Sequence, residues 1–238
     1  MSTRQRTGPA ELQLLQRETF DYFLKEVNPA NGLIIDKTAT DWPASIAATG
    51  LALACYPVGV EPGFMTRDAA VARNLTTLRF FWTSPHGPEP DATGYTGFYY
   101  DFLDRQTARR AWQCELSTVD SAFLLAAVLT AAVYLGDDST DGREIRALAD
   151  TLYRRADWQW AQNQGATVKH GWKPESGFLD YRWDGYDEAL LLYVLGLGSP
   201  TNPGEPGNPY GWWVSPWHFG LNQGPIVLMI ENYRSGFS

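Results

Sequence analysis

The stretch from Ala111 to Leu135 constrains the fold more than any other part of the chain, because it ends in a helix with almost no polar face. Its apolar run from Ala122 is broken only by Thr130. That run is shorter than the roughly 18 residues that a membrane span needs, and a helix that is apolar all round has to be surrounded by other helices. Ser117 followed by Asp120 is typical of an N-cap with an acid at the positive helix end. We therefore expect the inner helix of a soluble helical protein, with no membrane partner.

The composition fits one large domain with an acidic surface. The 238 residues are 44% hydrophobic and 14% aromatic, which is enough to bury a core, and we expect a single domain over residues 1–238. A Pro/Gly-rich junction lies near residues 199–211. The net charge of −8 and the isoelectric point near 4.9 argue against a nucleic-acid or anionic-membrane partner, since an acidic surface repels both. A neutral or cationic ligand is the better expectation.

The cysteines, histidines and N-terminus exclude several other classes of protein. Cys55 and Cys114 lie in apolar surroundings, so we expect buried free thiols and no disulfide framework. The three histidines lack the spacing of zinc ligands, so we expect neither a metal nor another cofactor. The N-terminal residues include arginines but no apolar signal-peptide core, which by itself predicts a cytoplasmic protein.

Helical periodicity predicts about seven helices, most of which alternate between an outer and an inner type. The expected ranges are 11–27, 43–55, 66–82, 118–135, 141–162, 186–197 and 225–233. Helices 43–55, 118–135 and 186–197 are apolar and read as inner helices, whereas 66–82 and 141–162 carry charged faces. An aromatic segment near residues 95–115 predicts a hairpin or an ordered lid. The fold class is therefore all-α, a ring of helical hairpins with the ligand site where the inner helices begin.

Acidic and aromatic residues recur before each inner helix. The candidate site residues are Asp41, Trp42, Tyr99, Tyr100, Asp101, Asp104, Trp112, Glu115, Asp120, Trp183, Asp184, Asp187 and Glu188. Flat aromatic faces suit the apolar faces of sugar rings, and paired carboxylates can split a glycosidic bond. The alternative is structural: the aromatics fill gaps between helices and the acids only cap them, Asp184 with Asp187 forming a second cap.

Electrostatic reasoning ranks four carboxyls as catalytic candidates. Glu188 lies beside Asp187 and one turn after Asp184, and like charges at that spacing raise a carboxyl pKa, which suits a general acid. Asp120 and Asp101 are expected to stay ionised, which suits a base or a hydroxyl acceptor, and Glu115 fits either role. The remaining candidates are expected to bind substrate.

Three blocks of the sequence resemble the bacterial glycoamylase-like family, which includes endo-β-1,2-glucanases and a domain of cyclic β-1,2-glucan synthases. The blocks are GFYYDFLDRQTARRAWQCELSTVDSAFLLAAVLTAAVYL, GYDEALLLYVLGLGSPT and QGPIVLMIENYRSG. The resemblance implies an (α/α)6 toroid, hydrolysis of β-linked glucan without a metal, and an oligo- or polysaccharide partner. It also implies that Glu188 is catalytic, that Asp101, Asp104, Glu115 and Asp120 line the groove, and that the protein is exported.

Two departures from the family pattern keep an alternative open. Roughly five helices of a twelve-helix ring are absent, which exposes inner faces and favours a homo-oligomer. Asn222 stands where the family often has an Asp. The first hypothesis is a glycoside hydrolase that uses carboxylate acid and base catalysis on β-glucan, β-1,2-glucan above all. The alternative is a non-catalytic or vestigial carbohydrate-binding domain, and a third reading is a helical scaffold without a ligand.

Overall fold

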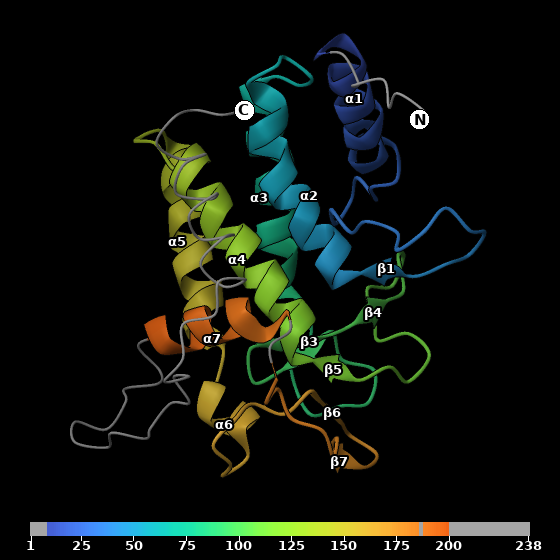
Figure 1. Cartoon of the computed structure of the whole chain (residues 1–238), viewed down its shortest axis with the longest axis vertical. Coiled ribbons are helices and arrows are strands. Elements are labelled where there is room, and N and C mark those ends of the chain that lie inside the picture. The colour runs from blue at the N-terminus through green and yellow to red at the C-terminus, as the bar shows by residue number, and fades with distance from the viewer. Residues whose placement is uncertain (1–8, 186–187, 200–238) are drawn as a thin grey trace, which may run out of the picture.

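A computed structural model describes residues 9–185 and 188–199 of the chain. In these residues seven helices and seven short strands alternate in groups along the sequence (Figure 1). The helices are α1 (Pro9–Lys25), α2 (Ile46–Val60), α3 (Arg67–Thr83), α4 (Thr118–Leu135), α5 (Thr140–Arg155), α6 (Trp158–Gln162) and α7 (Ala189–Gly198). The strands are β1 (Ala44–Ser45), β2 (Gly94–Tyr95), β3 (Phe98–Tyr100), β4 (Phe102–Leu103), β5 (Leu116–Ser117), β6 (Gly171–Lys173) and β7 (Gly177–Phe178).

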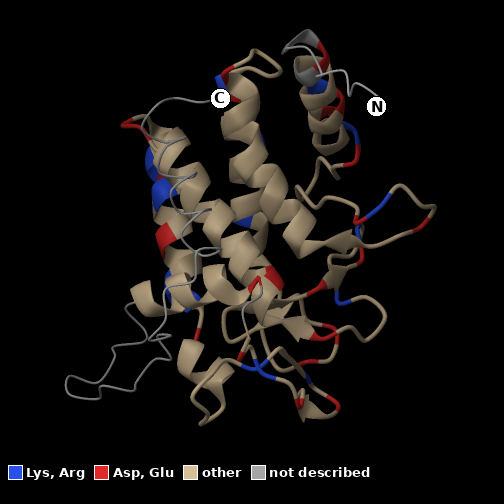
Figure 2. Ribbon diagram, viewed as in Figure 1, with Lys and Arg blue, Asp and Glu red and all other residues tan. Residues whose placement is uncertain are grey.

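The longer helices form two layers. The apolar helices α2 and α4 pack along one another, and α7 packs against α4 (Figure 1). Helices α3 and α5 pack together and form the second layer, in which α3 contacts α2 and α5 contacts α4. Gly50 brings α2 close to α4, because a Cβ at this position would lie 2.8 Å from the Leu124 Cα. Figure 2 shows Lys and Arg on α5, whereas α2 and most of α4 carry no charge. The predicted division into inner and outer helices therefore describes this part of the chain.

Helix α4 is the central element of the structure. Its start and end coincide with the prediction, and the Ser117 side chain accepts a hydrogen bond from the Asp120 amide as expected of an N-cap. By length and composition α4 could cross a membrane, but most of its residues are buried by the surrounding elements. It is built as a core helix.

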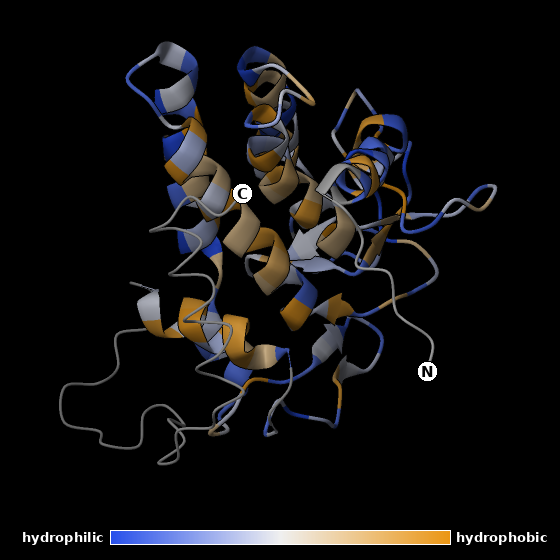
Figure 3. Ribbon diagram, turned by 45° about the horizontal axis from the view of Figure 1, so that its top comes forward, coloured by the Kyte–Doolittle hydropathy of each residue, from blue (hydrophilic) through white to orange (hydrophobic). Residues whose placement is uncertain are grey.

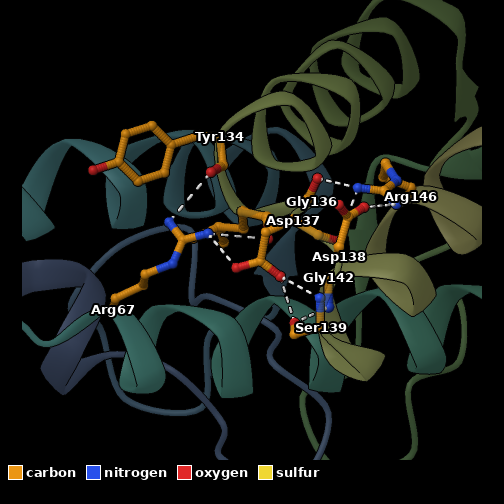
Figure 4. Close-up of polar contacts among 9 residues, drawn as sticks. Arg67, Tyr134, Gly136, Asp137, Asp138, Ser139, Gly142 and Arg146 are labelled. Carbon is orange, nitrogen blue, oxygen red and sulfur yellow. Dashed lines mark hydrogen bonds and ion pairs between the residues drawn. The ribbon is translucent and has the colours of Figure 1, made fainter.

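Polar contacts fix the turn between α4 and α5, at the end of α4 opposite its N-cap (Figure 4). The Asp137 carboxylate accepts hydrogen bonds from Arg67 Nη2 and from the Ser139 amide, both at 3.0 Å. Arg67 Nη2 also donates to the Leu135 carbonyl at 3.3 Å, and the Ser139 hydroxyl caps α5 by accepting from the Gly142 amide at 3.0 Å. One arginine at the start of α3 thus joins the ends of all three helices.

Short strands correct the prediction of a purely helical chain. Strands β2, β3, β5, β6 and β7 form an antiparallel sheet in that order, and β1 pairs with β4. Tyr99 on β3 lies opposite Ser117 on β5, which in turn lies opposite Gly171 on β6. The hairpin expected near residues 95–115 is present, whereas the β6–β7 hairpin was not predicted because strands of two or three residues carry little periodicity. Because β5 leads directly into α4, the sheet lies at the N-terminal end of that helix.

Several predicted helix boundaries are wrong for identifiable reasons. The helix expected over 141–162 is divided because Asp157 accepts a hydrogen bond from the Trp160 amide and starts α6. Helix α2 begins at Ile46, after β1 and the Ser45 cap, and continues through Pro57 to Val60. Helix α7 follows Glu188, so Asp184 is not its cap. Asp187, the helix expected at 225–233 and all but the first residue of the 199–211 junction lie outside the described residues.

The core joins both layers to the sheet. Leu53 of α2, Leu125 of α4, Leu78 of α3 and Trp158 of α6 are all buried. Figure 3 shows the hydrophobic residues concentrated along the inner helices. Cys114 is buried and Cys55 half-buried, and both are free thiols.

Candidate functional site

Four predicted catalytic carboxyls lie at the N-terminal end of α4. Asp101 separates β3 from β4, Glu115 precedes β5, Asp120 lies in the first turn of α4, and Glu188 directly precedes α7. The charges of Asp120 and Glu115 act on Asp101, and those of Glu188 and Glu115 act on Asp120. Figure 2 shows acidic positions, coloured red on the ribbon, near the start of α4 and along the neighbouring strand region. Residues from four separate segments therefore form one acidic cluster, defined here as these four carboxyls.

Backbone hydrogen bonds hold Asp101 in the cluster. The Asp101 amide donates to the Glu115 carbonyl at 3.1 Å, and the Asp101 carbonyl accepts from the Ile46 amide at 3.1 Å. Asp101 is thereby fixed between the segment leading into α4 and the start of α2. The cluster accordingly lies where two inner helices begin, which is the position predicted from the sequence.

Burial raises the pKa of two of the carboxyls. Burial raises the pKa of Asp101 to about 7, and the neighbouring charges of Asp120, Glu115 and Asp36 add to the effect. Burial also raises the pKa of Asp120, assisted by Glu188 and Glu115 and opposed by the Ser117 hydroxyl. The shifts run in the opposite direction to the expectation that both acids stay ionised, because burial outweighs the Ser117 hydroxyl that favours the charged form of Asp120.

The other two carboxyls are more open to water. Glu115 is half-buried and its Oε2 lies 3.8 Å from Lys173 Nζ on β6, so a cation partly balances it. Glu188 is exposed, and its side chain does not cap α7. The cluster thus combines two half-buried carboxyls whose pKa is raised with the half-buried Glu115 and the exposed Glu188.

Three predicted aromatic residues serve as support for the cluster. Tyr99 and Tyr100 are fully buried, the first against Phe81 at a ring distance of 4.8 Å. Trp183 is also buried: it stacks on His170 at 3.8 Å and donates from Nε1 to Thr118 Oγ1 at 3.0 Å. None of these faces is free to stack on a sugar. They fix the sheet and the start of α4.

Four other predicted residues line a pocket of about 750 Å³, namely Asp41, Trp42, Asp104 and Trp112. The rings of Trp42 and Trp112 meet edge to face at 4.7 Å. Asp104 has a local role, because its carboxylate accepts from the amides of Gln106 and Thr107, which lowers its pKa. Asp184, by contrast, is exposed and does not line this pocket.

Asp36 belongs to the surroundings of the site although sequence reasoning did not select it. Its Oδ2 accepts a hydrogen bond from Trp42 Nε1 at 3.1 Å, and its charge contributes to the raised pKa of Asp101. Asp36 stands well before the inner helix, so its position in the sequence carries no signal of this contact. Among the described residues no group of three or more His, Cys, Asp or Glu side chains is arranged to hold a metal ion.

Comparison with known proteins identifies one curated relative and several similar structures. An exo-β-1,2-glucooligosaccharide sophorohydrolase from Parabacteroides distasonis is 23% identical over 214 residues, which are 86% of this chain and 28% of that protein. A glucoamylase-like protein from Bacteroides uniformis is 26% identical with a TM-score of 0.73, over 83% of this chain and 48% of that one. No known family profile matches the chain.

An endo-β-1,2-glucanase from Chitinophaga pinensis, crystallised with sophorotriose and glucose, shares the fold with 20% identity and a TM-score of 0.66. That match covers 79% of this chain and 46% of the glucanase. The chain thus spans about half the length of these solved structures and less than a third of the sophorohydrolase. Within those bounds, the predicted resemblance to the glycoamylase-like family, with its β-1,2-glucan hydrolases, is confirmed.

Proposed function

We propose that this chain is part of an (α/α)6 toroid and hydrolyses β-linked glucan, with β-1,2-glucan as its substrate. The observation that carries the proposal is the convergence of Asp101, Glu115, Asp120 and Glu188 at the start of α4. Hydrolysis of a glycosidic bond needs one carboxyl that donates a proton and a second that is ionised. The curated relative is a β-1,2-glucooligosaccharide hydrolase, which supports both the reaction and the linkage.

The surroundings of each carboxyl suggest how the roles divide. Asp101 fits the proton donor, because burial raises its pKa to about 7 and it holds its proton near neutrality. Glu188 is exposed at the start of α7, where water reaches it, and fits the base that activates water. This exchanges the role first predicted for Glu188, which rested partly on Asp187. Asp120 and Glu115 fit hydroxyl acceptors that orient the sugar.

The proposal is tested by incubating the purified chain with linear β-1,2-, β-1,3- and β-1,4-glucans and following released oligosaccharides by chromatography. Release from the β-1,2-glucan alone is expected. Asp101→Asn and Glu188→Gln abolish it, whereas Asp150→Asn and Glu18→Gln, which change exposed acids on α5 and α1, do not.

Two results would contradict the proposal. If Asp101→Asn and Glu188→Gln released as much oligosaccharide as the control variants, Asp101 and Glu188 would not be the proton donor and the base. No release by the wild type, together with a tryptophan fluorescence change on adding glucan, would favour the non-catalytic carbohydrate-binding alternative.

A further inference from the structure

We propose that the pocket lined by Trp42 and Trp112 is an additional sugar subsite, which binds glucose units of the same glucan chain away from the bond that is cut. This inference rests on the proposed function and specifies its substrate as a chain longer than a disaccharide. The pocket is lined by residues 27–29, 41–43, 104–107 and 109–112. Its volume of about 750 Å³ falls in the range of roughly 300 to 1,000 Å³ typical of small-molecule sites.

An exposed indole forms one wall of the pocket. Trp112 is 58% exposed, although it contacts Trp42 at a ring distance of 4.7 Å and Phe102 at 5.5 Å. These contacts hold the ring in place and leave much of its surface in water. A fixed aromatic surface of this kind can cover the apolar face of a sugar ring while the hydroxyl groups at the edge of the sugar stay hydrated.

Unusual backbone conformations gather around this pocket. Of the seven non-glycine residues with positive φ in the described part of the chain, four lie on or beside its wall. They are Asp41 at 55°, Ala108 at 60°, Trp112 at 52° and Gln113 at 55°. Side chains rarely adopt this region, and such residues tend to gather where a fold holds groups for a ligand. Here the strained positions include Trp112 itself.

The polar lining suits hydroxyl groups of a neutral ligand. Arg109 and Arg110 are already balanced, with distances of 3.4 Å to Asp91 and 2.7 Å to Glu175. Arg105 also lines the pocket, and its Nε is buried with no hydrogen-bond partner among the residues that the structure describes. Arg105 Nη2 donates to the Glu26 carbonyl at 3.3 Å, which holds this side chain at the pocket wall.

The pocket adjoins the acidic cluster through the tryptophan pair. Trp42 donates from Nε1 to Asp36 at 3.1 Å, and the charge of Asp36 reaches Asp101. Phe102, which contacts the Trp112 ring, directly follows Asp101 in the chain. In this proposal, one oligosaccharide extends from the cluster across the indole pair into the pocket.

The test measures equilibrium binding of a β-1,2-glucooligosaccharide series, from sophorose upward, to the Glu188→Gln variant by isothermal titration calorimetry. That variant separates binding from turnover. Affinity is expected to rise with chain length. Adding Trp112→Ala should weaken binding of the longest oligosaccharide about tenfold, while sophorose binding changes less than about twofold.

Two further variants keep the test independent of folding. Trp112→Phe retains an aromatic face and should recover part of the lost affinity. Trp82→Ala removes another exposed indole, at the end of α3, and should leave the length dependence unchanged. Circular dichroism melting curves verify that each variant is folded.

The outcomes separate this inference from the proposed function. Unchanged length dependence in Trp112→Ala, or equal losses in Trp112→Ala and Trp82→Ala, would overturn the subsite even if the wild type hydrolyses glucan. Length-dependent binding that requires Trp112 would support the subsite even if the wild type releases no sugar.

Discussion

At the scale of single residues, Asp101 is the side chain whose chemistry depends most on the fold. Its pKa of about 7 results first from burial and then from the charges of Asp120, Glu115 and Asp36. As a proton donor it must be protonated, so the rate of glucan cleavage is expected to fall as the pH rises through about 7. A pH-rate profile of kcat/KM measures this descending limb, and a rate that keeps rising above pH 8 would exclude Asp101 as the donor.

A substrate whose leaving group departs without a proton distinguishes the proposed proton donor, Asp101, from the proposed base, Glu188. Asp101→Asn is expected to lower kcat on linear β-1,2-glucan by about 10²–10⁴-fold, the range for loss of a general acid. On an aryl β-glucoside with a strongly acidic phenol the loss should be much smaller, whereas Glu188→Gln should be impaired on both substrates. Equal losses for Asp101→Asn on both substrates would instead assign Asp101 a role in binding.

The same carboxyl links stability to pH. Because its pKa is higher in the folded than in the unfolded chain, the folded state binds more protons between about pH 4 and 7, and stability falls as pH rises through that window. Asp101→Asn removes this contribution. The free energy of unfolding of the variant, relative to that of the wild type, should therefore be higher at pH 8 than at pH 5. Urea titrations at both pH values measure the difference. A difference between the proteins that does not vary with pH would contradict the assigned pKa.

At the scale of elements, the close packing of α2 on α4 fixes both inner helix starts beside the cluster. Gly50→Ala would place a Cβ 2.8 Å from the Leu124 backbone, so it should lower the free energy of unfolding by about 1–3 kcal/mol through overpacking. Val58→Ala, on an exposed position of the same helix, serves as the control and should change it by less than about 0.5 kcal/mol. Equal stability of Gly50→Ala and wild type would show that the two helices can separate without cost.

The elements also show what sequence alone can predict. Both ends of α4 were predictable because the Ser117 cap and the apolar run each mark a boundary locally. The β6–β7 hairpin and the break at Asp157 were not, because they depend on pairing with distant segments or on one cap among many acids. The acidic cluster was predictable from repeated acids before inner helices. The raised pKa of Asp101 and of Asp120 and the burial of Tyr99 were not, because they depend on the packed structure.

At the scale of the whole molecule, the inner helices present apolar side chains to water. Leu51 on α2 is 51% exposed, Val133 on α4 80% and Val194 on α7 57%. Solved relatives are about twice as long as the matched part of this chain. Exposed apolar side chains on three neighbouring helices favour association, so the protein is expected to self-associate as its concentration rises.

Sedimentation equilibrium over a concentration series measures this association. Val133→Lys places a charge among the exposed apolar residues and should shift the protein toward monomer. Ala147→Lys, on an exposed position of α5 in the outer layer, should not. A wild type that stays monomeric at the highest concentration would contradict a role for these residues in association.

The most direct test of the central claim is the initial rate of oligosaccharide release from linear β-1,2-glucan, compared between the wild type, Glu188→Gln and Glu18→Gln. If the carboxyls at the start of α4 form a catalytic site, the wild type and Glu18→Gln release sugar at equal rates and Glu188→Gln releases none above background. Release by Glu188→Gln at the wild-type rate, or no release by the folded wild type, would show that the acidic cluster does not perform this reaction.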